Sequence, residues 1–552
     1  MTMPTVDAAA PWLRSYPAHW RAPTDGRPML ELFADMLGRH GDAVAIRYFD
    51  GVLTWRDVDV ESNALAVGLI ERGVRAGDRA AVLVQNIPQF VIYVLAVWKV
   101  GAIPVPSNPG YREVELARLF ADCTPAVVLA QLDQGGVARA ALDMAESGAL
   151  LLVTNPRSYQ TRNTSILPAP VAAPDRCELF EDVIAARIGC TPPTIISTSA
   201  SLGLIMYTSG TTGVPRGAMM THANLAFNTQ VFTILSETTS ADVIFAAAPF
   251  FHITGMICHF AAACVAGCAM VLPYRLIAEP ALALIREHRP TVTIAAITAF
   301  NALMSAPGAT FTDFASFRHV SSGGAPVAPA LHDELLRRTG MEIHVGYGMT
   351  ETTSPAVFTP VARNIPVHPE YGALSIGIPT PGTEVRIVGE DGAEAPPGEP
   401  GEVCMRGPQI MAGYWQKPVE TAAVLSDDGW LRSGDVGVMD DAGRIYLVDR
   451  KKDMIVASGF KVWPREVEDV LHQHPAVHEA AVVGAPDAYR GETVLAYVSL
   501  KPGTVAAQDD LKAHCRALLT GYKQPRDIVI LDELPKTVTG KIQRNVLRDR
   551  TA

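Results

Sequence analysis

Charged and aromatic side chains are scarce in this sequence, and basic residues are not in excess. Charged residues make up 19% and aromatic residues 7% of the 552 residues, and Asp and Glu outnumber Lys and Arg by 57 to 46. The net charge of −11 argues against nucleic-acid binding and against docking on anionic lipid, because both require a basic surface. With 48% hydrophobic residues, the composition is typical of a well-buried globular enzyme.

Cysteine is also scarce, with eight residues and no paired spacing. This pattern predicts a protein of the reducing cytoplasm, because a disulfide framework uses regularly paired cysteines. One cluster contains Cys258, His259, Cys264 and Cys268. Its neighbours from Phe260 to Met270 are almost all small and apolar, which favours buried structural thiols over a zinc site.

Long hydrophobic runs are limited to Met256–Pro273, which is only just long enough to span a membrane. The run lacks the charged flanks and aromatic belt of a membrane span, so we predict a buried helix that leads into a core strand. The N-terminus has neither the basic start nor the apolar core of a secretory signal. We therefore expect a cytoplasmic protein without an integral membrane span.

A chain of this length is too long for a single ordinary core, so more than one domain is expected. Helix and strand patterns alternate over its first part. The predicted elements are helices at Leu53–Glu71 and Pro88–Val100 and strands at Arg79–Gln85 and Ala102–Val105, with similar alternation over Val127–Val153 and Val243–Ala299. This spacing predicts a parallel sheet with right-handed crossovers.

Past Gly372 the pattern changes to short alternating runs such as Glu384–Val388 and Glu402–Arg406, which are typical of antiparallel strands. A shorter α/β block follows Lys452. Its predicted elements are helices at Pro464–His472 and Gln508–Leu519 and strands at Glu479–Val483 and Val494–Leu500. The predicted fold is therefore α/β, with a large N-terminal domain (residues 1–451) of parallel α/β subdomains plus an antiparallel, barrel-like portion, and a small, mobile α+β C-terminal domain (residues 452–552).

The most informative stretch is Thr208–Gly217, which lies between predicted strands at Leu202–Tyr207 and Ala218–Thr221. Its glycines let backbone N–H groups approach a phosphate, its hydroxyls add donors, and Arg216 supplies a cation. The residues concerned are Thr208, Ser209, Gly210, Thr211, Thr212, Gly213 and Gly217. The loop is neither a Walker P-loop nor a dinucleotide fingerprint, and alone it would also fit a Ser/Thr/Gly-rich surface turn.

The stretch from Tyr207 to His222 resembles the phosphate loop of the acyl-adenylate-forming (AMP-binding) enzymes, which include acyl-CoA synthetases, luciferases and peptide-synthetase adenylation domains. Those loops usually carry Lys where this chain has Arg216, which keeps the charge and offers a planar fork to phosphate oxygens. Other family signatures follow in order as far as about Arg544. The resemblance implies that a carboxylate attacks the α-phosphorus of ATP and that pyrophosphate leaves.

Two further stretches resemble the parts of the family that hold the nucleotide and its metal. In the run Gly346, Tyr347, Gly348, Met349, Thr350 and Glu351, the family implies that Thr350 contacts the α-phosphate and that Glu351 helps to hold Mg²⁺. Asp435 resembles the ribose-binding acid, with Arg450 assisting. A solvated Asp in a Gly turn is the alternative for Asp435.

The adenine and the acyl group are assigned by resemblance to two other stretches. Gly323, Gly324, Ala325 and Pro326 resemble the segment along the adenine, and the family's acyl pocket corresponds to His252, Thr254, Gly255, Met256, Gly323 and Gly324. These walls are small or flexible and uncharged, which favours linear medium- to long-chain fatty acids. A histidine satisfied in the core is the alternative for His252.

The C-terminal block carries the last family signature at Pro535–Lys541, where Lys541 would reach the carboxylate and the α-phosphate. Lys452 matches the family's pivot, and Ser458 and Gly459 fall where coenzyme A would enter. Without the neighbouring signatures these residues would be an exposed lysine, an ordinary linker and a turn.

The stretch Val448–Glu468 looks most like bacterial medium- and long-chain fatty acyl-CoA synthetases, and the chain ends soon after Lys541 without a carrier domain. The resemblance therefore implies an ATP-dependent acyl-CoA ligase that uses ATP, Mg²⁺ and coenzyme A. Three alternatives are an aryl-acid CoA ligase, a ligase that loads a carrier protein, and a non-catalytic acyl-nucleotide sensor. The sequence leaves the acyl chain length and the oligomeric state open, a homodimer included.

Overall fold

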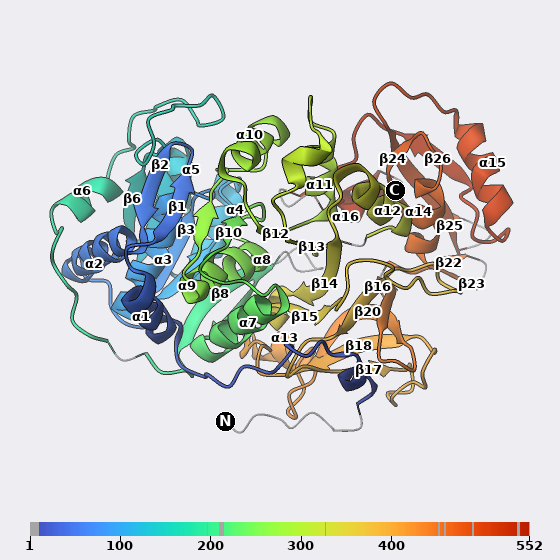
Figure 1. Cartoon of the computed structure of the whole chain (residues 1–552), viewed down its shortest axis with the longest axis horizontal. Helices are drawn as coiled ribbons and strands as arrows, with labels where there is room; N and C mark the ends of the chain where they lie inside the picture. Colours follow the sequence, from blue (N-terminus) through green and yellow to red (C-terminus); the bar gives the residue numbers. More distant parts are fainter. Residues whose placement is uncertain are drawn as a thin grey trace.

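The computed structural model describes residues 10–195, 197–208, 215–325, 327–450, 453–457, 460–487, 491–537 and 541–550. Within these residues the strands form sheets of thirteen, five, five and three strands. Figure 1 shows the first helices and sheets in blue and green at one end, the antiparallel strands in orange below, and the C-terminal elements in red at the other end. The predicted α/β fold class is confirmed.

The first five-stranded sheet is parallel throughout, in the order β4-β3-β5-β6-β7. Its strands are β3 (Arg79–Leu83), β4 (Ile103–Pro106), β5 (Val127–Gln131), β6 (Leu150–Thr154) and β7 (Glu178–Leu179), and the helices of this part are α2 (Trp55–Glu71), α3 (Pro88–Val100), α4 (Glu113–Cys123), α5 (Leu132–Met144) and α6 (Phe180–Ala185). Helix α3 has the predicted bounds. Helix α2 begins later than predicted, because the Thr54 hydroxyl accepts a hydrogen bond from Asp57 N and caps the helix there.

The thirteen-stranded sheet begins with a second parallel group, in which β1, β11, β10, β12, β13 and the first half of β14 are neighbours. The strands are β1 (Val44–Tyr48), the antiparallel edge strand β2 (Gly51–Thr54), β10 (Val243–Phe245), β11 (Ala269–Val271), β12 (Val292–Ala295), β13 (His319–Ser322) and β14 (Ile343–Met349). The helices are α1 (Met29–His40), α7 (His222–Leu235), α8 (Ile253–Gly255), the π-helix η2 (Met256–Ala261), α9 (Ala262–Ala266), α10 (Ala278–His288), α11 (Ile297–Met304) and α12 (Pro329–Thr339), with short 3₁₀ turns η1 (Pro11–Ser15), η3 (Phe311–Phe314) and η4 (Thr350–Thr352). Helix α1 and strand β1 were not predicted.

The long apolar run is interior, as predicted: η2 and α9 lead into the core strand β11. Cys258, Cys264 and Cys268 have no exposed surface. Over the described ranges, no helix is both long and apolar enough to cross a membrane. In the same ranges, no group of three or more His, Cys, Asp or Glu side chains is arranged to hold a metal ion.

The predicted antiparallel portion is confirmed, but it begins before Gly372. The second half of β14 pairs antiparallel with β15 (Ser354–Phe358), because the turn at η4 reverses the chain. The other strands are β16 (Ser375–Pro379), β17 (Glu384–Val388), β18 (Gly401–Arg406), β20 (Leu431–Met439) and β21 (Ile445–Arg450), and the helix of this part is α13 (Pro418–Ala422). Strand β14 therefore joins the parallel and antiparallel strands.

The strands predicted on either side of the glycine-rich loop are present, and the structure shows that they pair as a hairpin. Strand β8 (Leu202–Thr208) pairs antiparallel with β9 (Arg216–Thr221), and β19 (Gly413–Tyr414) adds a third strand on the other side of β9. The loop is thus held at one end of a rigid hairpin that also contacts residues far along the chain.

The C-terminal elements form the second five-stranded sheet and cover it with helices. They are β22 (Ile455–Ala457), β23 (Phe460–Val462), α14 (Pro464–His472), β24 (Val477–Asp487), β25 (Gly491–Leu500), α15 (Gln508–Leu518), β26 (Asp527–Ile530) and α16 (Arg544–Asp549). Helix α14 has the predicted bounds, and α15 ends one residue earlier than predicted. Apolar side chains of this block, such as Val467, Leu471 and Val482, form a core of their own.

Candidate active site

The β8–β9 hairpin fixes both ends of the predicted phosphate loop. Thr208 and Arg216 are cross-strand partners, and the Thr208 hydroxyl donates to the Arg216 carbonyl over 3.5 Å. Ser209, Gly210, Thr211, Thr212 and Gly213 lie outside the described residues, so their contacts with phosphate stay predictions.

Arg216 belongs to a cluster with Tyr414 and Glu351. The Arg216 guanidinium lies 5.5 Å from the centre of the Tyr414 ring, and the Tyr414 hydroxyl donates to Glu351 Oε1 over 2.7 Å. Burial, and then the charge of Glu351, raise the pKa of Tyr414, so the phenol keeps the proton that it donates. Because β19 pairs with β9, the Tyr414 side chain is placed between a predicted phosphate-binding cation and the predicted metal ligand.

Glu351 sits in the sharp turn between β14 and β15. The turn continues through Thr353 and Ser354, which have φ of 52° and 85°, a left-handed conformation that costs free energy for residues with a side chain. Asn228 of α7 is fully buried, and its Nδ2 donates to the Thr353 carbonyl over 2.5 Å. Gly348 is needed here, because a Cβ at this position would lie 2.0 Å from the Ser354 carbonyl oxygen.

Tyr347 and Asp435 meet across the antiparallel part of the sheet, where the Tyr347 hydroxyl donates to Asp435 Oδ2 over 2.7 Å. Asp435 is half-buried on β20, and its cross-strand partner on β21 is Arg450. The structure thus brings the predicted ribose acid beside the aromatic ring of the predicted second signature and beside the residue predicted to assist it.

The predicted adenine segment follows β13. Gly324 has a φ of 77°, which favours glycine, and a Cβ there would meet no atom within 4 Å. Gly323 lies against Gly346, since a Cβ on it would be 3.0 Å from the Gly346 carbonyl oxygen. Ala325 is half-buried, and Pro326 lies outside the described residues.

The predicted acyl-site residues lie at the start of α8 and η2. His252 caps α8, with Nδ1 accepting from Thr254 N over 3.4 Å. Met256 is fully buried, and a Cβ on Gly255 would lie 2.1 Å from the Pro249 carbonyl oxygen. Close backbone packing therefore explains the glycine at position 255, and the role of these residues as a pocket wall stays a prediction.

Lys541 lies near enough to His252 for its charge to act on the imidazole. Burial, and then the positive charge of Lys541, lower the pKa of His252 to about 4, so this histidine is neutral at pH 7. The backbone of Lys541 is tied to Thr537, with Lys541 N donating to Thr537 Oγ1 over 3.1 Å and Thr537 N donating to the Lys541 carbonyl over 2.8 Å. The last signature and the predicted acyl entrance are thus brought together from opposite halves of the chain.

Buried neutral histidines should make the fold sensitive to acid. Burial lowers the pKa of His222, His252 and His259 to about 4, so the unfolded chain takes up these protons first as pH falls. Their contribution to stability is complete above the ordinary value of about 6.5 and should fall by about 2 kcal/mol per buried histidine at pH 5. Asp469 partly offsets this loss, because burial raises the pKa of its carboxyl to about 7.

We therefore expect the free energy of unfolding, measured with urea, to decrease between pH 7 and pH 5. The matched variant His222→Gln should show a smaller decrease than the unmodified chain, because it lacks one of the three groups. A free energy of unfolding that stays constant or rises between pH 7 and pH 5 would refute the lowered pKa values of these three histidines.

The structure describes the strands next to the predicted pivot and coenzyme A channel, but not the predicted residues themselves. Lys452, Ser458 and Gly459 lie outside the described residues, between β21 and β23. Tyr414 and Asn228 are site residues that the sequence did not reveal. The only local signal for Tyr414 is an aromatic residue directly after Gly413, which is too common to identify a site.

The site combines a hairpin with a basic residue, an acidic turn, and a lysine on a separate C-terminal block. This set of groups fits an enzyme that activates an acid with a nucleotide. Residues 33–415 match the family model of the AMP-binding enzyme, and residues 466–541 match that of the AMP-binding enzyme C-terminal domain. The chain belongs to the AMP-binding enzyme family.

Relatives of known function match over almost the whole chain. A long-chain-fatty-acid–CoA ligase of Bacillus subtilis (strain 168) is 34% identical over 566 aligned positions, covering 99% of both chains. A feruloyl-CoA synthase of an Amycolatopsis species is 35% identical, covering 92% of this chain and 96% of its own. Among solved structures, ATP-bound MatB from Rhodopseudomonas palustris is 28% identical with a TM-score of 0.82 over 94% of this chain and 98% of its own, whereas apo MatB over the same coverage has a TM-score of 0.73.

Proposed function

We propose that this chain is an ATP-dependent acyl-CoA ligase. In the first half-reaction a carboxylate oxygen of the acid attacks the α-phosphorus of ATP, and pyrophosphate leaves. In the second, the thiol of coenzyme A loses its proton and attacks the acyl carbonyl, and AMP leaves. The observation that carries the proposal is that Lys541 lies near enough to His252 for its charge to act on the imidazole. A cation there would stabilise the charge that develops when the acid meets the phosphate.

The other side chains have complementary tasks in this reaction. Arg216 lies beside the loop that would hold the phosphates, and Asp435, fixed by Tyr347, would accept hydrogen bonds from the ribose hydroxyls. The carboxylate of Glu351 fits Mg²⁺, a hard cation that takes most of its other ligands from phosphates and water. When bound, Mg²⁺ would neutralise charge on the leaving pyrophosphate. The Tyr414 hydroxyl orients Glu351 for this task.

For the acid, we propose a linear medium- to long-chain fatty acid. The Bacillus subtilis relative is named for long-chain fatty acids, and the predicted walls around Gly324 carry no charge that would anchor a polar acid. The feruloyl-CoA synthase supports an aryl acid as the second candidate. Free cysteines throughout the chain support a cytoplasmic location.

We further propose that the chain divides at Lys452 into a domain of residues 1–451 and a domain of residues 452–552. The separate apolar core of the C-terminal block supports this division. Lys541 would have to leave the acyl site before coenzyme A can enter, so Lys452 would act as the hinge, and Ser458 and Gly459 would line the thiol channel.

Pyrophosphate release from ATP, measured across a panel of alkanoates, benzoates and cinnamates with and without coenzyme A, tests the proposal. An alkanoate of medium or long chain should give the highest kcat/KM, and the thioester should form only with coenzyme A. A panel in which aryl acids exceed every alkanoate would refute the fatty-acid substrate, and no pyrophosphate release with any acid would refute the ligase.

Enlarging Gly324 should shorten the preferred acyl chain. Gly324 is exposed and a Cβ on it would meet no atom within 4 Å, so a larger side chain can be accommodated there. If this position lines the proposed pocket, the Leu side chain of Gly324→Leu takes up part of its length. Each methylene that no longer fits should lose about 0.8 kcal/mol, or about fourfold in kcat/KM. The control Gly324→Ala carries the same backbone strain at a φ of 77° but adds only one methyl group. An unchanged chain-length profile for Gly324→Leu, measured over the same panel, would place this residue outside the pocket.

A further inference from the structure

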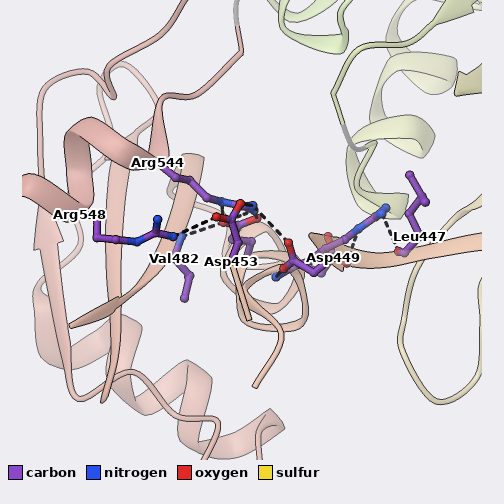
Figure 2. Close-up of polar contacts among 9 residues, drawn as sticks. Leu447, Asp449, Asp453, Val482, Arg544 and Arg548 are labelled. Carbon is purple, nitrogen blue, oxygen red and sulfur yellow. Dashed lines mark hydrogen bonds and ion pairs between the residues drawn. The ribbon is translucent and has the colours of Figure 1, made fainter. Parts of the chain in front are cut away.

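Three buried carboxylates and a half-buried arginine lie on both sides of residues 451–452. We call Asp449, Asp453, Glu468 and Arg544 the pivot cluster. Figure 2 shows that Arg544 reaches from α16 toward Asp453, on one side of residues 451–452, and toward Asp449 at the end of β21, on the other side. The cluster therefore links the C-terminal block to the rest of the chain at the point where the hinge is proposed.

Arg544 is the centre of the pivot cluster. Its guanidinium binds both carboxylate oxygens of Glu468, with Nη2 donating to Oε1 over 2.8 Å and to Oε2 over 2.6 Å. Its Nη1 reaches Asp449 Oδ1 at 3.4 Å and Asp453 Oδ2 at 3.5 Å. A planar guanidinium can satisfy three carboxylates at once, which a lysine ammonium does less well.

Asp449 depends on contacts from the C-terminal block. Its side chain is 3% exposed, and besides Arg544 it accepts a hydrogen bond from Arg465 N over 3.0 Å. The Arg465 guanidinium in turn donates to the Leu447 carbonyl over 2.9 Å. Rotation about residues 451–452 would withdraw these donors from a buried carboxylate, which is costly. The cluster thus favours the arrangement that the structure shows.

That arrangement is the one suited to the first half-reaction. Arg544 follows Lys541 by three residues, so the contacts of Arg544 restrain the segment that carries Lys541 to the acyl site.

We infer that Arg544 is a positioning residue: by bridging Asp449 and Glu468 across residues 451–452, it holds Lys541 beside His252 and so supports acyl-AMP formation but not thioester formation. This inference rests on the proposed ligase function and its two half-reactions.

The test compares Arg544→Gln with the unmodified chain in each half-reaction. Pyrophosphate release in a single turnover should fall at least about tenfold, whereas acyl-CoA formation from supplied acyl-AMP should be unchanged or faster. Arg544→Lys keeps one charge and should recover part of the loss. Arg548→Gln is the matched control, because Arg548 binds Asp453 over 3.0 Å and Asp453 lies on the same side of residues 451–452 as Arg548.

A second measurement does not depend on the ligase function. Hydrogen exchange of backbone amides in residues 445–450, followed without substrates, should be faster in Arg544→Gln than in the unmodified chain or in Arg548→Gln. Asp449→Asn should change exchange and pyrophosphate release in the same direction as Arg544→Gln. Unchanged exchange, or an equal loss of both half-reactions at an unchanged Tm, would overturn the inference. Faster exchange in a chain that ligates no acid would refute only the proposed function.

Discussion

Lys541→Ala is expected to form acyl-AMP at least about 10²-fold more slowly than the unmodified chain, while acyl-CoA formation from supplied acyl-AMP is largely kept. The attacking carboxylate and the α-phosphate repel each other, and a cation between them stabilises the transition state more than the separate ground states. His252 cannot replace the lysine, because its lowered pKa leaves it uncharged at pH 7. Pyrophosphate release and thiol consumption, each followed in a single turnover, measure the two steps.

Lys536→Ala is the matched control for this variant. Lys536 lies in the same segment but forms ion pairs with Glu479 at 2.9 Å and Glu533 at 3.3 Å, so its loss should change either step by less than about threefold. Pyrophosphate release at the unmodified rate in Lys541→Ala would show that the lysine has another role. An equal loss in both half-reactions would indicate damage to the C-terminal fold.

The local parts of the site could be predicted from the sequence because they depend on short-range patterns. The short runs on either side of the glycine-rich loop predicted two strands, and the structure forms β8 and β9 there and pairs them. Arg216 and Asp435 were found because resemblance to a family marks single positions, whatever surrounds them. The structure adds the neighbours that orient these side chains.

Tyr414 and Asn228 could not be predicted, since their roles arise only from tertiary pairing. Tyr414 reaches Glu351 because β19 joins β9, and Asn228 reaches the turn at Thr353 because α7 packs beneath it. Neither residue stands in a distinctive local pattern. Contacts between segments far apart in the chain therefore complete a site whose individual residues a motif can locate.

The reason for a glycine at a given position is a second thing that the sequence did not predict. Gly255 was predicted to line the acyl pocket, and Gly348 to belong to the nucleotide signature. The structure gives each a packing reason, because a Cβ would collide with the carbonyl of Pro249 or of Ser354. Strand β14 pairs parallel with β13 and antiparallel with β15. The antiparallel strands therefore begin earlier in the chain than the sequence pattern predicted.

Lys452→Pro and Gly459→Leu are both expected to release pyrophosphate in a single turnover yet make acyl-CoA at least about tenfold more slowly than the unmodified chain. Proline fixes φ near −65° and would prevent the backbone rotation that the proposed hinge requires. Leucine at position 459 would fill a channel that must admit the thin thiol arm of coenzyme A. Both residues lie outside the described part of the chain. The described residues Asp449 and Asp453 lie on either side of the proposed hinge.

Two controls separate these causes from loss of folding. Lys452→Ala removes the same side chain but leaves φ free, so it should keep thioester formation, whereas Lys452→Pro should not. Gly521→Leu adds the same bulk to the C-terminal block at a position where a Cβ would meet no atom within 4 Å, and it should keep both half-reactions. An equal loss of both half-reactions in a well-folded Lys452→Pro chain would contradict the hinge. A chain that cannot rotate at position 452 should still catalyse the half-reaction that its fixed arrangement supports. Unimpaired thioester formation in Gly459→Leu would remove position 459 from the path of coenzyme A and leave the hinge proposal standing.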